Sequence, residues 1–174
     1  MKLGAYRKKS PWILHYNAGS CNGCDIEILA TLAPHYDVER LGMLNRGNPK
    51  QSDILLVTGP VTHRSRDRLV ELYAQMPEPK VVIAVGSCTC TGGIFRHMYH
   101  VGNGVDQFIP VDVYVTGCAT RPEQIIEGVT QALAILENKD KSIERPTRLM
   151  GVIEERGGQT IRREMAAKVE DESN

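Results

Sequence analysis

Five short apolar runs along the chain predict β-strands. They lie at 12–16, 38–43, 54–57, 81–85 and 111–115, and most of them are rich in β-branched residues. Most of the runs are too apolar to alternate with polar positions, and Glu39 and Arg40 interrupt the second run. Near-continuous apolar runs of this length are typical of parallel strands in a sheet that is covered on both faces.

Apolar residues at helical spacing lie between these runs and predict α-helices. One pattern ends at Pro34 and another at Pro77. The clearest begins at Thr120-Arg121-Pro122-Glu123, which favours a capping box with proline in the first turn, and continues as an apolar stripe to Leu136. Strands that alternate with helices predict an α/β fold, a doubly wound parallel sheet of about five strands with helices on both faces.

The polarity of the sequence divides the 174 residues into three parts. We expect an N-terminal extension at 1–10, one domain at 11–138, and a polar C-terminal tail at 139–174. Within the tail, the apolar pairs on either side of Gly157-Gly158 favour a short β-hairpin at 149–164.

Composition and charge exclude several classes of protein. Apolar residues make up 41% of the chain, which is enough for a hydrophobic core. The 21 basic and 21 acidic side chains cancel, whereas nucleic-acid-binding proteins usually carry a basic excess. No run reaches the roughly 18 apolar residues of a transmembrane helix, and no secretory signal follows the basic start. We therefore expect a protein that stays inside the cell and binds no nucleic acid.

Four of the five cysteines follow predicted strands. Cys21 and Cys24 come after the first strand, Cys88 after the fourth, and Cys118 after the fifth. Because the carboxyl ends of parallel strands meet at one edge of a sheet, the predicted fold brings these residues together. An uneven set of cysteines in an intracellular protein more often binds metal or does redox chemistry than forms disulfides.

Four converging thiolates can hold an iron–sulfur cluster or a zinc ion. Zinc sites of four cysteines usually consist of two C-x-x-C pairs, whereas this chain has one such pair, Cys21 and Cys24. Loops after separate strands approach from different directions, as the corners of a [4Fe–4S] cube require, so the spacing favours the cluster over zinc. A reactive-thiol enzyme is the third interpretation.

Other polar residues near the cysteines have simpler interpretations. Cys90 forms C-x-C with Cys88, a spacing too tight for two corners of one cube, so we expect a bystander thiol. Ligation by Cys90 in place of Cys88 is the alternative. Asp25 and Glu27 suit the positive end of a helix dipole, and Glu27 is also a candidate proton relay.

The long stretch at 94–108 has no predicted strand but carries considerable apolar mass, including Phe95, Met98 and Tyr99. Such a stretch is a candidate contact surface. The histidines of the chain show no spacing typical of metal ligands, and we interpret them as surface or core residues. No glycine motif matches a nucleotide-binding loop.

Several motifs follow one another between about Ser10 and Leu136. They are Ser20-Cys21-Asn22-Gly23-Cys24-Asp25-Ile26-Glu27, Thr58-Gly59-Pro60-Val61-Thr62, Gly86-Ser87-Cys88 with Gly92-Gly93, Ile109-Pro110-Val111-Asp112-Val113, and Gly117-Cys118 with Arg121-Pro122-Glu123. Together these motifs resemble the small subunit of membrane-bound, energy-converting [NiFe] hydrogenases. The same superfamily includes the small iron–sulfur subunit of respiratory complex I.

The resemblance implies a flavodoxin-like fold that carries a single [4Fe–4S] cluster, the one nearest the catalytic large subunit. The ligands it implies are Cys21, Cys24, Cys88 and Cys118. The usual Cys-Pro-Pro of the family reads Cys118-Ala119-Thr120 here, a departure that removes no ligand. Backbone donors of Gly23, Ser87 and Gly117 are candidates for hydrogen bonds that tune the potential of the cluster.

The same resemblance implies the setting in which the chain works. It would be an electron-transfer subunit of an oxidoreductase complex, inactive alone, and would pass electrons from a ferredoxin-like subunit to a hydrogenase-like large subunit. A membrane-embedded subunit would hold it at the cytoplasmic side of the membrane. A related complex that reduces sulfur compounds or a quinone is the alternative, and a zinc-stabilised interaction module is a more remote one.

Overall fold

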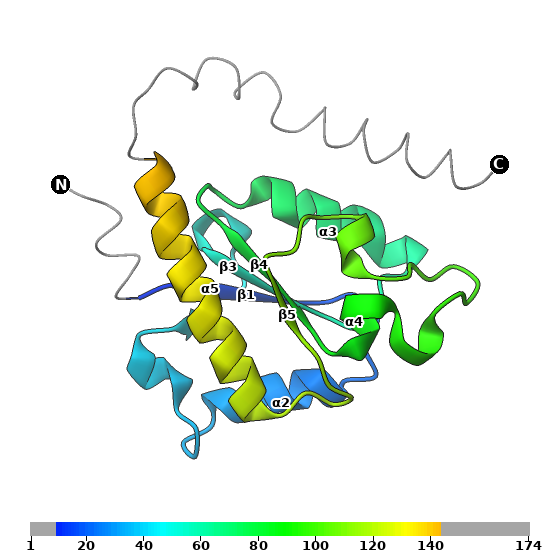
Figure 1. Cartoon of the computed structure of the whole chain (residues 1–174), viewed down its shortest axis with the longest axis horizontal. Coiled ribbons are helices and arrows are strands. Elements are labelled where there is room, and N and C mark those ends of the chain that lie inside the picture. Colours follow the sequence, from blue (N-terminus) through cyan, green and yellow to red (C-terminus); the bar gives the residue numbers. More distant parts are fainter. Residues whose placement is uncertain (1–9, 144–174) are drawn as a thin grey trace.

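The computed structural model describes residues 10–143 (Figure 1). Its strands are β1 (Trp12–Asn17), β2 (Leu44–Asn45), β3 (Ile54–Thr58), β4 (Val81–Val85) and β5 (Val113–Val115). Its α-helices are α2 (Gly23–Leu32), α3 (His63–Gln75), α4 (Ser87–Thr91) and α5 (Pro122–Ile143). Four 3-10 turns lie between them: η1 (Val38–Leu41), η2 (Pro49–Gln51), η3 (Gly93–Phe95) and η4 (Val105–Gln107). The hairpin expected at 149–164 and most of the N-terminal extension lie outside the described residues.

The strands form one sheet in the order β2-β1-β3-β4-β5, and every neighbouring pair is parallel. In the centre of the sheet, Leu56 of β3 lies opposite His15 of β1 and Ile83 of β4. This strand order is that of the flavodoxin-like doubly wound fold. The predicted fold class is therefore confirmed.

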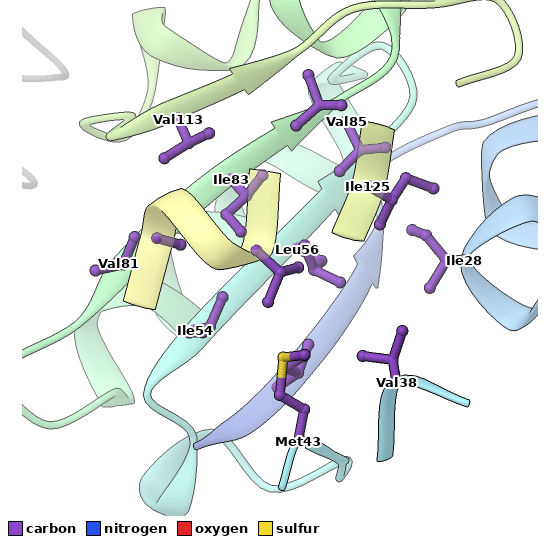
Figure 2. Packing of buried hydrophobic residues seen from close by; sticks show 14 of the residues in the cluster. Ile28, Val38, Met43, Ile54, Leu56, Val81, Ile83, Val85, Val113 and Ile125 are labelled. Atoms are coloured by element: carbon purple, nitrogen blue, oxygen red, sulfur yellow. The ribbon is translucent and has the colours of Figure 1, made fainter. Parts of the chain in front are cut away.

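Two hydrophobic clusters cover the two faces of the sheet. Leu56 packs on one face with Ile28 of α2 and Ile125 of α5, and Figure 2 shows this cluster. The neighbouring Leu55 points to the opposite face and packs with Leu69 of α3. Because both faces are covered, every residue of β3 and β4 is buried, which explains the continuous apolar runs in the sequence.

The strand predicted at 38–43 is wrong. Residues 38–41 form the 3-10 turn η1, and the edge strand β2 follows only at 44–45. Gly42 has a left-handed φ of 85° and donates its N–H to the carbonyl of Glu39, so the chain turns where the prediction extends it. Val38 at the start of this turn and Met43 just after it are both buried. These two residues account for the apolar pattern.

Helix α5 begins one residue later than the predicted capping box implies. Arg121, and not Thr120, precedes the first helical residue Pro122, since its carbonyl accepts the first backbone hydrogen bonds of the helix. The backbone N–H of Arg121 donates to the side-chain oxygen of Gln124 at 3.4 Å. Thr120 is fully buried and lies outside the helix.

Helix α5 continues to Ile143, and so includes polar residues that follow position 138. Near this end of α5, Lys139 donates to the carboxylate of Asp112 at 2.6 Å and to the carbonyl of Lys80 at 3.0 Å. These bonds tie α5 to the beginnings of β4 and β5. Within the described part of the chain, none of the helices has the length and apolar character needed to cross a membrane.

Candidate functional site

The four cysteines predicted to converge follow strands whose carboxyl ends share one edge of the sheet. Cys21 lies in the loop between β1 and α2, and Cys24 lies in the first turn of α2. Cys88 lies in the short helix α4, which begins directly after β4 and Gly86. Cys118 lies between β5 and α5. Three loops therefore supply four thiols to the same edge.

The thiol of Cys88 is affected by burial and by the other three cysteines. Burial is the first cause that raises the pKa of the Cys88 thiol, and the charges of Cys118, Cys21 and Cys24 raise it further. Cys21 and Cys118 are exposed, whereas Cys24 and Cys88 are partly buried. Two of the four thiols are therefore accessible from the surface.

Glycines leave room for backbone to lie close to two of these sulfurs. A Cβ atom at Gly86 would lie 2.7 Å from the sulfur of Cys24, and one at Gly93 would lie 3.2 Å from the sulfur of Cys88. Gly86 and Gly93 also have positive φ values of 91° and 52°. The site therefore has no space for side chains at these two positions, and the backbone itself forms its wall.

The loops that carry Cys88 and Cys118 are fastened to each other. The backbone N–H of Ser87 donates to the carbonyl of Gly117 at 2.9 Å, and the Ser87 hydroxyl donates to the same oxygen at 3.1 Å. The Ser87 N–H is thus used within the protein, so its predicted role as a donor to a cluster sulfur is wrong. The separation between these two cysteine loops is fixed by this pair of bonds.

The donor set fits a [4Fe–4S] cluster, for which four thiolates are the usual ligands. Three separate loops carry the four thiols, and glycine at positions 86 and 93 lets the backbone lie close to two of the sulfurs. Across residues 10–143, no three His, Cys, Asp or Glu side chains are gathered in the arrangement that would hold one metal ion.

Cys90 lies apart from the glycine-lined edge, inside the hydrophobic cluster on the α3 side of the sheet. Its sulfur contacts the carbonyl oxygens of Ala84 at 3.7 Å and Val115 at 3.9 Å. Burial raises the pKa of the Cys90 thiol to about 11, so the residue is a neutral thiol near pH 7. Its predicted role as a bystander remains a prediction.

Asp25 makes a hydrogen-bond network that the sequence analysis missed. Its carboxylate is buried and accepts hydrogen bonds from Asn17 at 2.6 Å and from the hydroxyl of Thr58. His15 lies 2.9 Å from the same carboxylate. The prediction treated Asp25 as a partner of the helix dipole, but the residue joins α2 to the ends of β1 and β3. The signal in the sequence was its position three residues before the buried Ile28, on the inner face of α2.

Glu27 lies on a different face of α2 from Asp25 and is partly exposed. Its charge is one of the smaller causes that raise the pKa of Tyr36, after the hydrogen bond that Tyr36 donates to Glu123 at 2.8 Å, burial, and the charge of Glu123. Its role as a proton relay remains a prediction.

The stretch at 94–108 exposes large apolar side chains, as its composition predicted. Ile94 is 77% exposed and Tyr99 is 88% exposed. Ile26 and Leu29 of α2 are also exposed, in the helix that begins at the cysteine edge. Exposed apolar groups of this size are typical of surfaces that contact another protein, and the contact surface remains a prediction.

Comparisons with known proteins identify a family and several relatives. A family model described as NADH ubiquinone oxidoreductase, 20 Kd subunit, matches residues 21–132. A probable membrane-bound hydrogenase subunit, mbhJ of Pyrococcus furiosus, is 53% identical over 125 residues, which are 72% of this chain and 75% of that protein. A subunit of the NADH-quinone oxidoreductase of Chlorobium phaeobacteroides is 46% identical over 132 residues, 75% of this chain and 70% of that protein.

Among solved structures, the fold matches a chain of the membrane-bound sulfane sulfur reductase, an archaeal respiratory membrane complex. The TM-score is 0.68 and the sequence identity is 39%, over 78% of this chain and 75% of that chain. The chain belongs to the family of the 20 Kd subunit of NADH ubiquinone oxidoreductase, and its resemblance to the small subunits of membrane-bound hydrogenases is confirmed.

Proposed function

We propose that this chain is an electron-transfer subunit that holds a single [4Fe–4S] cluster with Cys21, Cys24, Cys88 and Cys118. The observation that carries the proposal is the position of these four cysteines, which come from three loops at one edge of the parallel sheet. When bound there, such a cluster takes up and releases one electron at a time. The chain itself supplies no catalytic residue in this proposal.

The residues around the thiols hold the cysteine loops in place. Ser87 and Gly117 fix the distance between the loops of Cys88 and Cys118. The partial burial of Cys24 and Cys88 lowers the local dielectric, whereas the exposed Cys21 and Cys118 face the surface on which a partner can dock. Electrons would therefore enter or leave through this edge.

The proposed partners are those that the resemblance implies, and two relatives support this kind of complex. One relative is a membrane-bound hydrogenase subunit and another is a subunit of an NADH-quinone oxidoreductase. We infer contacts with a hydrogenase-like large subunit, a ferredoxin-like iron–sulfur subunit and a membrane-embedded subunit at the cytoplasmic side of the membrane. The exposed apolar side chains of α2 and of residues 94–99 support such contacts. In this complex, the final step would be the reduction of protons to hydrogen.

Sulfur reduction is a second candidate for the whole complex. The solved chain of the sulfane sulfur reductase supports it, because that chain is 39% identical to this one over most of both. The role of the cluster in this chain would stay the same, since the substrate is bound elsewhere in the complex. Reduction of a quinone is the corresponding candidate suggested by the NADH-quinone oxidoreductase relative.

The test uses the native assembly, isolated without oxygen through a tag on this chain. Iron, nickel and zinc are counted, and hydrogen evolution is assayed with reduced ferredoxin or viologen beside the reduction of polysulfide and of a quinone. Iron together with nickel and hydrogen evolution would support the proposal that the complex is a hydrogenase. Iron without nickel, with polysulfide or quinone reduction, would support the alternative complex. Zinc without iron would overturn the cluster role.

A further inference from the structure

Thr120 is a fully buried residue whose hydroxyl contacts a cysteine sulfur. It is 0% exposed, and its oxygen lies 3.9 Å from the sulfur of Cys24. Because Arg121 precedes helix α5, the Thr120 hydroxyl is not used to cap that helix. Within residues 10–143, the Cys24 sulfur is the hydrogen-bond partner that the structure gives this hydroxyl.

The direction of this hydrogen bond follows from the chemistry of the two groups. A cysteine that ligates iron is a thiolate, which has no hydrogen to donate. The hydroxyl of Thr120 must therefore be the donor. A buried hydroxyl without a partner is costly, which favours this bond. Gly86 lies beside both atoms, because a Cβ added there would be 2.7 Å from the sulfur and 3.8 Å from the oxygen. As a glycine, it has no side chain that could come between them.

We propose that Thr120 is a positioning residue for the Cys24 sulfur and that its hydrogen bond raises the reduction potential of the cluster. This inference rests on the proposed function, in which Cys24 is a ligand. A donor at a ligand sulfur draws electron density from that sulfur. It thereby stabilises the reduced state, in which the cluster and its thiolates carry one more negative charge.

The experiment compares two variants that differ in one hydroxyl. Thr120→Val keeps the branched shape and removes the donor, whereas Thr120→Ser keeps the donor. Each native assembly is titrated with a redox dye while its iron–sulfur signals are followed by electron paramagnetic resonance. The signal of this chain is the one that is missing from the Cys24→Ala assembly.

We expect Thr120→Val to lower the ratio of reduced to oxidised cluster about tenfold at a fixed solution potential, about 59 mV for one electron. Thr120→Ser should stay at the wild-type value. Thr120→Ala is a smaller variant that also lacks the hydroxyl. Its reduction potential should be lowered like that of Thr120→Val, even if the valine packs poorly. Thr31→Val is the matched control, because it removes a buried hydroxyl that bonds within α2 to the carbonyl of Ile28, and it should keep the wild-type potential.

A vibrational measurement separates tuning from a general loosening of the fold. The iron–sulfur stretching bands in resonance Raman spectra should shift in Thr120→Val and remain at the wild-type frequencies in Thr120→Ser and Thr31→Val. An unchanged potential in Thr120→Val, or an equal change in Thr120→Ser, would overturn the inference and leave the proposed function intact. A Cys24→Ala assembly that keeps every signal would instead overturn the proposed ligand set, and the inference with it.

Discussion

The side-chain amide of Asn17 donates a hydrogen bond of 2.6 Å to the carboxylate of Asp25. Asn17 is the last residue of β1 and Asp25 lies in the first turn of α2, so this bond joins the two ends of the loop that carries Cys21. The amide oxygen of Asn17 also accepts the backbone N–H groups of Gly19 and Ser20, both at 2.8 Å. One side chain thus organises the loop from within.

Replacement of Asp25 by alanine should destabilise the full-length chain. Its buried carboxylate accepts hydrogen bonds from Asn17 and Thr58 and lies beside His15, and these polar groups would lose their partner. We expect Asp25→Ala to lower the free energy of unfolding by about 2–4 kcal/mol, measured by urea denaturation at constant pH.

The control for this variant is Asp67→Ala. The side chain of Asp67 is 80% exposed and pairs at the surface with Arg66, so its removal should change the free energy of unfolding by no more than about 0.5 kcal/mol. Equal effects of the two substitutions would show that the buried network contributes nothing beyond a surface ion pair.

The buried phenol of Tyr73 should make the folded chain less stable in alkaline solution. Burial, assisted by the charges of Glu78 and Asp112, raises the pKa of Tyr73 from 10.0 to about 12. The unfolded chain therefore releases the phenol proton at lower pH than the folded chain. The contribution of Tyr73 to stability is complete below pH 10 and is lost as the pH rises from 10 towards 12.

The measurement is the absorbance of ionised tyrosine during an alkaline titration. The difference between the wild type and Tyr73→Phe should show one phenol that ionises near pH 12, and Tyr73→Phe should remove its part of the alkaline loss of stability. Tyr99→Phe, which removes an exposed phenol, controls for the loss of one hydroxyl. A difference curve centred at pH 10 would contradict the burial of Tyr73.

The fold could be predicted where burial dictates the sequence. Each residue of β3 and β4 is buried between two layers of helices, so the apolar runs marked these strands almost to the residue. The region at 38–43 could not be predicted in this way. Val38 and Met43 are buried from a turn, and two buried positions five residues apart fit a strand as well as they fit this turn.

The site could be predicted only where the chain order determines it. Parallel strands place their carboxyl ends at one edge, so the cysteines that follow β1, β4 and β5 were expected to meet. The contact of Thr120 with Cys24 joins residues 96 positions apart and depends on the exact start of α5, which the sequence analysis placed one residue too early. Bonds of this kind are decided by tertiary packing and leave no local pattern.

Gly86 should be intolerant of any side chain. A Cβ atom there would lie 2.7 Å from the sulfur of Cys24, and the φ of 91° is unfavourable for other residues. We expect Gly86→Ala to displace the sulfur and to remove most of the iron of the proposed cluster, counted in the native assembly. Gly47→Ala is the control, because nothing lies within 4 Å of its added Cβ. Full iron content in Gly86→Ala would show that the sulfur can move without loss of binding.

Substitution of each cysteine by alanine should separate ligands from the buried thiol. Cys21→Ala, Cys24→Ala, Cys88→Ala and Cys118→Ala should each remove the proposed cluster, since a cube needs four thiolate ligands. Cys90→Ala should keep it, because the Cys90 sulfur lies in the core against the carbonyls of Ala84 and Val115.

The cost of Cys90→Ala should be seen in the fold instead. Loss of a buried sulfur atom from the hydrophobic core around Leu69 should lower the free energy of unfolding by about 1 kcal/mol, and the iron content should stay unchanged. Cys88→Ala supplies the matched comparison, since Cys88 is two residues away and the charges of the other three cysteines act on its thiol. If Cys90→Ala lost iron while Cys88→Ala retained it, the ligand in α4 would be Cys90. The Cys90 side chain would then have to leave the hydrophobic core to reach the other cysteines.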